Sequence, residues 1–279
     1  MSDTTDPVAY YDEFGEQEWT RLDRDLYHRL EWDETTHFLT QHLPDAGRVL
    51  DVGGGAGRYS VWLADRGYDV VLVDPSERQV ELAEEKTAEH DVAERVTVET
   101  GDVRDLRFDS RSFDATLCLG GPLSHVLAEH DRRTAAGELA RVTTADSPVF
   151  VSVMGRLAAL QTIARHAGRL PEAQGETELL PQLSRTGDYD TALLDAFDRE
   201  PTAPPMHLFR ATELEELLEA ADLTVETVTG LESIVSQRRD DFDSLTDAQR
   251  SALREAVAVF RGDRAAADLS GHILAVASA

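Results

Sequence analysis

The sequence predicts an α/β fold built on a mostly parallel sheet. Between Arg48 and Val153, short apolar runs alternate with stretches of helical periodicity, and the first run leads into a glycine-rich turn. Such alternation is typical of parallel strands joined by right-handed helical crossovers. The chain has 279 residues, enough for one large domain or two small ones. We interpret it as one domain with additions.

The segment that precedes the first strand, residues 1–43, carries helical periodicity. Its apolar residues that recur near one helical face are Trp19, Leu22, Leu26 and Leu30. We expect most of these side chains to pack against the sheet. The same segment contains a tyrosine pair, Tyr10 and Tyr11.

The most informative segment is residues 49–58 (VLDVGGGAGR), where an apolar strand containing Asp51 runs into a turn. Four glycines form this turn: Gly53, Gly54, Gly55 and Gly57. Because glycine has no Cβ, the backbone N–H groups of the turn and the N-terminus of the next helix can approach a ligand closely. The segment therefore predicts a loop that binds a nucleotide cofactor.

The spacing of the glycines narrows the choice of cofactor. A dinucleotide loop needs G-x-G-x-x-G, but Arg58 or Ser60 stands where the third glycine should be. A phosphate loop also fails, because no Gly-Lys-Ser/Thr follows. The pattern D-x-G-x-G-x-G from Asp51 to Gly57 instead resembles the first motif of class I methyltransferases that depend on S-adenosylmethionine (SAM).

The second apolar run, residues 69–73 (DVVLV), ends at Asp74. A carboxylate at this strand end can accept hydrogen bonds from both hydroxyls of a ribose. Ser76 and Gln79 then predict a capping box that opens the next helix.

Two more strands end in the same region of the expected sheet. Residues 95–99 (RVTVE) lead into Gly101-Asp102-Val103, and residues 113–119 (FDATLCL) lead into residues 120–125 (GGPLSH). Each acid alone could be an ordinary turn residue that satisfies nearby N–H groups. That explanation does not account for four such features, in the order of the family, at successive strand ends.

The resemblance implies a role for each of these positions. Asp51 would hold the methionine amino group, the glycine backbone would contact the cofactor, and Asp74 would bind the ribose. Asp102 with Val103 would contact the adenine, while carbonyl groups near Leu119 and Gly120 would flank the methionyl group. The cofactor-binding residues expected in this way are Asp51, Gly53, Gly54, Gly55, Gly57, Asp74, Pro75, Asp102, Val103, Leu119, Gly120 and Tyr11.

Regular patterning lapses after the expected helix 131–144 and the fifth strand, 148–153 (PVFVSV). The next segment has helical patches only at 157–166 and 191–197, separated by proline and glycine. A segment this long is usually functional or disordered. In the family, an insertion here commonly covers the acceptor, so we expect a lid; the alternative is a solvated acidic excursion.

The C-terminal part returns to regular patterning. Thr212 and Glu215 predict a capping box, followed by a strand at 223–229 (LTVETVT), a helix at 246–261 and a buried strand at 271–277 (GHILAVA). This ending resembles that of the family.

The resemblance implies a doubly wound, seven-stranded, mostly parallel sheet with an antiparallel last strand and helices on both faces. An N-terminal helical cap and a helical insertion after the fifth strand would complete the fold. The expected division of the single domain is a cap at 1–43, a SAM-binding core at 44–154, a lid at 155–206 and the rest of the sheet at 207–279.

A general base is needed only if the methyl acceptor arrives protonated. His125 is the leading candidate, because the unperturbed pKa of histidine lies near neutrality and the residue follows the fourth strand. His207 is the second candidate. A packed or capping histidine is the alternative for both. Arg210 could clamp an acidic acceptor or simply pair with a carboxylate.

The composition limits the class of protein. The net charge is −27, from 54 acids against 27 basic residues, and Lys86 is the only lysine. This pattern resembles proteins of halophiles, whose surfaces remain hydrated at molar salt. A basic stripe for nucleic acid is not visible, so a nucleic-acid partner is disfavoured but stays open.

Cysteine and hydropathy patterns set further limits. Cys118 is the only cysteine, which excludes an intramolecular disulfide and any multi-cysteine metal site, and we expect no metal and a buried core thiol. Neither a signal peptide nor an apolar run of membrane-spanning length is present, which predicts a cytoplasmic location without a membrane partner.

Residues after the fourth strand disfavour some acceptors. Amino-methylating nucleic-acid enzymes carry Asn/Asp-Pro-Pro-Tyr where this chain has residues 119–122 (LGGP), and pyrimidine C5 enzymes need a cysteine that is commonly beside a proline, unlike Cys118. We therefore expect a small-molecule O-, N- or C-methyltransferase. The alternatives are an RNA or protein methyltransferase and a non-catalytic SAM-binding protein. The acceptor and the oligomeric state stay open.

Overall fold

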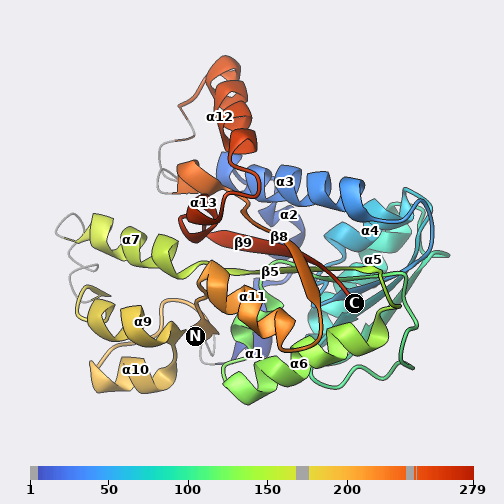
Figure 1. The fold of residues 1–279 in the computed structure, drawn as a ribbon, viewed down its shortest axis with the longest axis horizontal. Coiled ribbons are helices and arrows are strands. Elements are labelled where there is room, and N and C mark those ends of the chain that lie inside the picture. Colours follow the sequence, from blue (N-terminus) through green and yellow to red (C-terminus); the bar gives the residue numbers. More distant parts are fainter. Residues whose placement is uncertain (1–5, 168–175, 237–241, 243) are drawn as a thin grey trace.

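A seven-stranded sheet runs through the computed structural model, which describes residues 6–167, 176–236, 242 and 244–279 (Figure 1). The strand order is β3-β2-β1-β4-β5-β9-β8. Its strands are β1 (Arg48–Val52), β2 (Asp69–Asp74), β3 (Val96–Thr100), β4 (Ala115–Cys118), β5 (Pro148–Met154), β8 (Thr224–Gly230) and β9 (His272–Ser278). Strands β1 to β5 pair in parallel, whereas β9 is antiparallel to both β5 and β8. The predicted fold class is confirmed.

Helices cover both faces of this sheet (Figure 1). One face packs against α3 (Leu26–His42), α4 (Arg58–Ala64) and α5 (Glu77–Glu89), and the other against α6 (Glu129–Val142) and α11 (Ala211–Glu219). Since both faces are buried, the inner strands β2, β5 and β9 are mostly continuous apolar runs, whereas the edge strands β3 and β8 alternate.

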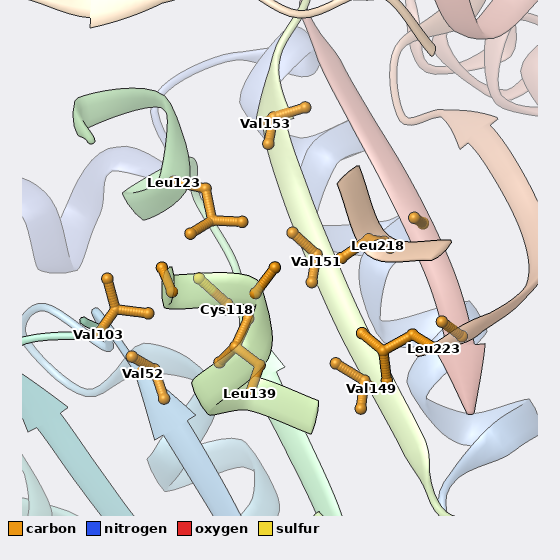
Figure 2. Packing of buried hydrophobic residues seen from close by; sticks show 14 of the residues in the cluster. Val52, Val103, Cys118, Leu123, Leu139, Val149, Val151, Val153, Leu218 and Leu223 are labelled. Carbon is orange, nitrogen blue, oxygen red and sulfur yellow. The ribbon is translucent and has the colours of Figure 1, made fainter. Parts of the chain in front are cut away.

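The core on the α6 and α11 face includes the single cysteine. Figure 2 shows Cys118 of β4 in one cluster with Val149 and Val151 of β5, Leu139 of α6 and Leu218 of α11. Burial raises the pKa of the Cys118 thiol to about 12. The side chain therefore behaves as a small apolar core group and not as a nucleophile.

The N-terminal segment folds as three helices, of which the first two lie at the carboxyl ends of the strands and the third on one face of the sheet. They are α1 (Pro7–Phe14), α2 (Gln17–Arg21) and α3. The expected single apolar face is divided between helices, because Asp25 ends the turn after α2 and its Oδ1 accepts a hydrogen bond from His28 N at 3.0 Å to begin α3. Residues 1–5 of the predicted cap lie outside the described residues.

The insertion after β5 has helices and a small sheet of its own. Its elements are α7 (Arg156–His166), α9 (Leu180–Thr186), β6 (Asp188–Tyr189), α10 (Thr191–Ala196) and β7 (Met206–His207). Strands of two residues are too short to show an apolar–polar alternation in the sequence, so the pairing of β6 with β7 was not predicted. Residues 168–175 of the predicted lid lie outside the described residues.

The C-terminal part shows one error of the sequence analysis. Helix α11 begins at Ala211, so Thr212 lies inside the helix and does not cap it. Arg210 N donates to Glu213 Oε2 at 2.9 Å, and Asp268 Oδ1 accepts from Ala211 N at 2.9 Å. Asp268 comes from α13 (Arg264–Asp268), a helix between α12 (Asp247–Val259) and β9 that the sequence analysis missed. A distant acid thus fixes the helix start.

None of the helices in the described part of the chain has the length and apolar character that crossing a bilayer would need.

Two glycine substitutions test the tight packing at the end of β5. A Cβ on Gly155 would lie 2.0 Å from the backbone oxygen of Ser270, whereas a Cβ on Gly137, within α6, would meet no atom within 4 Å. We expect Gly155→Ala to lower the free energy of unfolding by about 1–3 kcal/mol through overpacking. Gly137→Ala should raise it by about 0.5–1 kcal/mol, because alanine favours helix.

Chemical denaturation of both variants at the same KCl concentration measures these changes. Equal effects of the two substitutions would contradict the close contact between Gly155, after β5, and the backbone of Ser270, before β9.

Candidate active site

A cavity of about 450 Å³ opens at the carboxyl ends of β1, β2 and β4, where the strand order reverses. Doubly wound sheets bind ligands at this point, and the volume is typical of a small-molecule site. The expected site residues that line it are Tyr11, Gly53, Gly55, Asp74, Pro75, Asp102, Val103, Leu119, Gly120 and His125. Those that do not line it are Asp51, Gly54, Gly57 and His207.

The glycine turn joins β1 to α4 and forms the floor of the cavity. Gly53 and Gly55 have φ angles of +68° and +53°, and Gly57 caps α4 in the left-handed region at +85°. A Cβ on Gly53 would lie 2.3 Å from Pro122 Cγ, so the turn packs directly against η1 (Pro122–His125). Only glycine allows this backbone path and this contact.

Asp74 joins the turn to the end of β2. Its Oδ2 accepts a hydrogen bond from Gly55 N and its Oδ1 accepts one from Ser76 N, both at 2.9 Å. Burial, together with the nearby carboxylates of Glu18 and Asp12, raises the pKa of Asp74 to about 6, against the lowering effect of the two hydrogen bonds. The Asp74 carboxylate is therefore held in position, but the surrounding protein stabilises its negative charge only partly.

Asp51 lies beneath the turn and not on the cavity wall. It is 1% exposed, and its Oδ2 accepts a hydrogen bond from Ser60 Oγ at 2.7 Å. Burial raises the pKa of Asp51 to about 6, with Asp74 contributing to the rise. Gly54 packs closely against β2, since a Cβ at this position would be 2.7 Å from Leu72 Cγ.

Gln79 contributes to the cavity in a way that the sequence analysis missed. Its backbone N donates to Ser76 Oγ as predicted, but its side chain does not complete the capping box. Gln79 Nε2 instead donates to Tyr11 O at 2.8 Å and to Gly15 O at 3.2 Å, which ties α1 to α5. Gln79 Oε1 is buried without a hydrogen-bond partner in the described structure, and it offers an acceptor to a ligand.

The wall formed by the N-terminal helices adds a second missed residue, Glu18. Glu18 lines the cavity, and its Oε1 accepts from Arg21 Nε at 3.1 Å. Burial raises the pKa of Glu18. No motif marks this acid in the sequence, because it reaches the cavity only through the packing of α2 on the sheet.

The adenine-side residues lie at the rim. Asp102 Oδ1 accepts from Arg104 N and Arg104 Nε, each at 2.8 Å, and Arg104 also pairs with Asp102 Oδ2. The hydrogen bond from Arg104 lowers the pKa of Asp102.

Acids outnumber bases in the wall of the cavity. Arg104 is the only arginine or lysine in the described lining, and it is already paired with Asp102. The acids that line the cavity are Asp6, Glu18, Asp74, Asp102 and Asp131. A ligand with a positive charge suits this wall electrostatically.

His125 and Tyr11 meet at the edge of the cavity. The Pro205 carbonyl can only accept, so His125 Nδ1 carries the proton of their 2.9 Å hydrogen bond. His125 Nε2 then has a lone pair, and the Tyr11 hydroxyl lies 3.3 Å from it. Burial lowers the pKa of His125, outweighing the opposite effect of the carbonyl. The ring is a neutral base at pH 7.

The other basic candidates are engaged elsewhere. His207 lies on β7 outside the cavity lining, and its Nδ1 is 2.6 Å from Asp188 Oδ1. Arg210 Nε and an Arg210 terminal nitrogen contact the two carboxylate oxygens of Asp268 at 3.0 and 2.7 Å. His207 therefore links β7 to β6 within the insertion. Arg210 pairs with a carboxylate, which was the alternative to its clamping an acidic acceptor.

One group of potential metal ligands is present in the described part of the chain: Glu31, Glu232 and His272, all buried. Arg21 occupies both carboxylate oxygens of Glu31, at 2.6 and 2.8 Å, and His272 Nδ1 lies 2.5 Å from Glu232 Oε1. These contacts make the group an ion-pair network that anchors Arg21, whose terminal nitrogen lies 3.6 Å from the position of a Cβ on Gly120.

Comparison with known proteins identifies the core around this cavity. Residues 49–146 match the family model described as "Methyltransferase domain". Residues 49–146 thus resemble a methyltransferase domain. This similarity, the glycine turn and the acidic wall accord with the expected cofactor, SAM, which carries a positive charge.

Three similar proteins are informative. Glycine/sarcosine N-methyltransferase of Parasynechococcus marenigrum (strain WH8102) is 34% identical over 131 residues, 46% of this chain and 45% of that protein. The enzyme of the same name from Aphanothece halophytica is 36% identical over 101 residues, 36% of this chain and 38% of that protein. The chain thus spans less than half the length of either relative.

A solved structure extends the likeness of fold beyond the methyltransferase domain. A SAM-dependent methyltransferase from Methanosarcina mazei superposes with a TM-score of 0.58 at 16% identity, covering 86% of this chain and 96% of the other.

The raised pKa of Asp74 predicts a pH dependence of cofactor binding. A ligand that donates hydroxyl hydrogens to Asp74 favours the carboxylate, so binding lowers a pKa that is about 6 in the free protein. Affinity for SAM should therefore rise with pH, by about tenfold between pH 5 and pH 7.

Calorimetric titration at several pH values measures this dependence. Asp74→Asn, which cannot ionise, is the matched control and should flatten the profile. An unchanged profile in this variant would show that another group, such as Asp51, titrates instead.

Proposed function

We propose that this chain transfers the methyl group of SAM to a nucleophilic atom of a small-molecule acceptor. One observation carries the proposal: the cavity places the glycine turn and Asp74 in one wall and His125, with the lone pair on its Nε2, in the same lining. When bound, SAM supplies a methyl group activated by a sulfonium. The protein's own residues then have to position the two reactants and accept a proton.

Residues on three sides of the cavity would hold the cofactor. Asp74 and Gln79 Oε1 accept hydrogen bonds from the ribose hydroxyls, and Asp102 with Val103 contacts the adenine. In this proposal, Asp51 supports the turn through Ser60, in place of the direct contact with the amino group that the resemblance implies. The residues proposed to contact the cofactor are Tyr11, Gly53, Gly55, Asp74, Pro75, Gln79, Asp102, Val103, Leu119 and Gly120.

Positioning supplies most of the rate enhancement in an in-line displacement. Alignment of two bound reactants and exclusion of water contribute about 7–11 kcal/mol in favourable cases. Helix α1 closes the cavity with Pro7, Val8 and Tyr11. In this proposal residues 1–43 cover the cofactor, 44–154 bind it, 155–206 cover the acceptor and 207–279 complete the sheet.

His125 accepts the proton that the acceptor loses. The Pro205 carbonyl fixes the Nδ1–H tautomer, so the lone pair is on Nε2. The Tyr11 hydroxyl hydrogen-bonds to Nε2 before the acceptor enters. Burial raises the pKa of Tyr11, which keeps its hydroxyl protonated and able to donate.

The relatives and the charge support a small-molecule acceptor. Two relatives are named for methylation of glycine and sarcosine, and the net charge of −27 opposes the approach of nucleic acid. The same charge, with a single lysine, supports a high-salt habitat.

Calorimetric titration with SAM, S-adenosylhomocysteine and NAD, at molar KCl, tests the cofactor part of this proposal. We expect the native chain to bind the first two only, and Asp74→Ala to weaken that binding by about tenfold or more, since it removes the acceptor of the ribose hydroxyls. Equal binding after the substitution would remove Asp74 from the site, and binding of NAD alone would overturn the proposal.

Substitution of His125 tests the base. His125→Gln retains a polar side chain without a basic lone pair, and should lower kcat by about 10²- to 10⁴-fold while SAM affinity stays within about twofold. Initial rates of S-adenosylhomocysteine production measure kcat on the acceptor that the native chain methylates.

His207→Gln is the matched control, because it removes a buried histidine outside the cavity. It should lower stability without a comparable loss of kcat. A larger loss of kcat in this variant than in His125→Gln would show that His207, and not His125, is the general base.

A further inference from the structure

A second cavity, of about 430 Å³, lies beneath the insertion at the carboxyl end of β5. Its wall combines α7 and α9 of the insertion with Met154 of β5 and Tyr27 of α3. Most of this wall is apolar. The apolar residues on which the argument rests are Met154, Ala159, Ile163, Leu179, Leu183 and Leu208.

Polar groups in this wall are engaged within the protein. Thr162 Oγ1 donates to Ala158 O at 2.9 Å, and Ser236 Oγ accepts from Gly271 N at 2.7 Å. The Tyr189 hydroxyl lies 3.1 Å from Thr202 Oγ1. A charged ligand would lose its hydration here without a matching set of free partners, whereas an apolar ligand would gain from burial.

In the described wall of this cavity, the charged side chains come from two segments of the insertion. Arg165 and His166 belong to the last turn of α7, and Glu176 belongs to the next described segment of the insertion. The other described residues of the lining, among them Met154, Leu183 and Leu208, carry no charge. The cavity therefore has a polar side and an apolar interior.

The two cavities approach each other at two points. Met154 lines the second cavity, and its Cε is 3.1 Å from the position of a Cβ on Gly121, next to Gly120 in the first cavity. The second point is the segment before β7. There, the Pro205 carbonyl holds His125, and the next residue, Met206, lines the second cavity.

We propose that the second cavity binds the body of the methyl acceptor, so that the acceptor is an uncharged, largely apolar small molecule. Its nucleophilic atom extends past Met154 and Met206 toward His125 Nε2. This inference rests on the proposed function and names its substrate class. None of the residues that line the second cavity falls within residues 49–146, so the family match does not determine this class.

Binding of an apolar probe to the full chain tests the cavity. The uncharged fluorophore N-phenyl-1-naphthylamine should bind at one saturable site in the presence of SAM, because the two ligands occupy different cavities. Ala159→Trp fills the second cavity and should weaken probe binding by about tenfold or more, while SAM affinity stays within about twofold.

Ala164→Trp is the matched control, on an exposed position of the same helix that does not line the cavity. It should leave both affinities unchanged. Ala203→Trp approaches the cavity from another segment and replaces Ala159→Trp if that variant does not fold. Probe binding that survives both filling substitutions, or that competes with SAM, would overturn the proposal.

A methyl-transfer assay distinguishes a failure of this inference from a failure of the proposed function. With SAM, the native chain should methylate 2-naphthalenethiol, an apolar thiol that needs little help from a base, in preference to glycine. Ala159→Trp should raise the KM for the thiol by about tenfold or more, and kcat less.

The outcomes are distinct. A chain that binds SAM and methylates glycine, with a KM that Ala159→Trp does not change, keeps the proposed function and loses the apolar acceptor. A chain that binds no SAM loses the proposed function whatever the probe does. Binding of SAM without transfer to the thiol also counts against the apolar acceptor.

Discussion

The close approach of the glycine turn to the end of β2 is the constraint on which the site depends. Because β1 and β2 are parallel with Val52 opposite Val73, Gly53 at the start of the turn lies level with Asp74. Gly53 N then donates to Val73 O at 2.7 Å, and Gly55 N reaches the Asp74 carboxylate. Any side chain at Gly53 would displace Pro122 and with it η1. One backbone path therefore sets the positions of both walls of the first cavity.

That path buries carboxylates at an energetic cost. Burial raises the pKa values of Asp51 and Asp74 to about 6, and α2 adds a third acid, Glu18, at the same place. Native structures tolerate such groups at functional sites, where a ligand completes their interactions. The unpartnered Gln79 Oε1 belongs to the same arrangement. In the proposed function, a cationic ligand with hydroxyl donors would stabilise these carboxylates.

The sheet and its strand ends could be predicted because their signals are local: apolar runs, glycine spacing and an acid after β2. The features that were missed depend on residues distant in sequence. Asp268 fixes the start of α11, which made the predicted capping box at Thr212 wrong. Gln79 turns toward Tyr11, 68 residues earlier, and so leaves its own capping box incomplete. The roles proposed for individual site residues remain predictions, and the second cavity had no sequence signal because separate segments enclose it.

In the proposed function, the insertion does more than cover an acceptor, because its Pro205 carbonyl also determines which nitrogen of His125 accepts the proton. The carbonyl that fixes the tautomer belongs to Pro205, next to β7. This segment is held firmly: Arg156 Nε donates to Leu208 O at 2.9 Å, and an Arg156 terminal nitrogen lies 2.7 Å from Glu213 Oε2 on α11. A displacement of the segment would change the direction of the His125 lone pair and the shape of the second cavity together. In these proposals, selection of the acceptor and activation of its nucleophile depend on one short piece of chain.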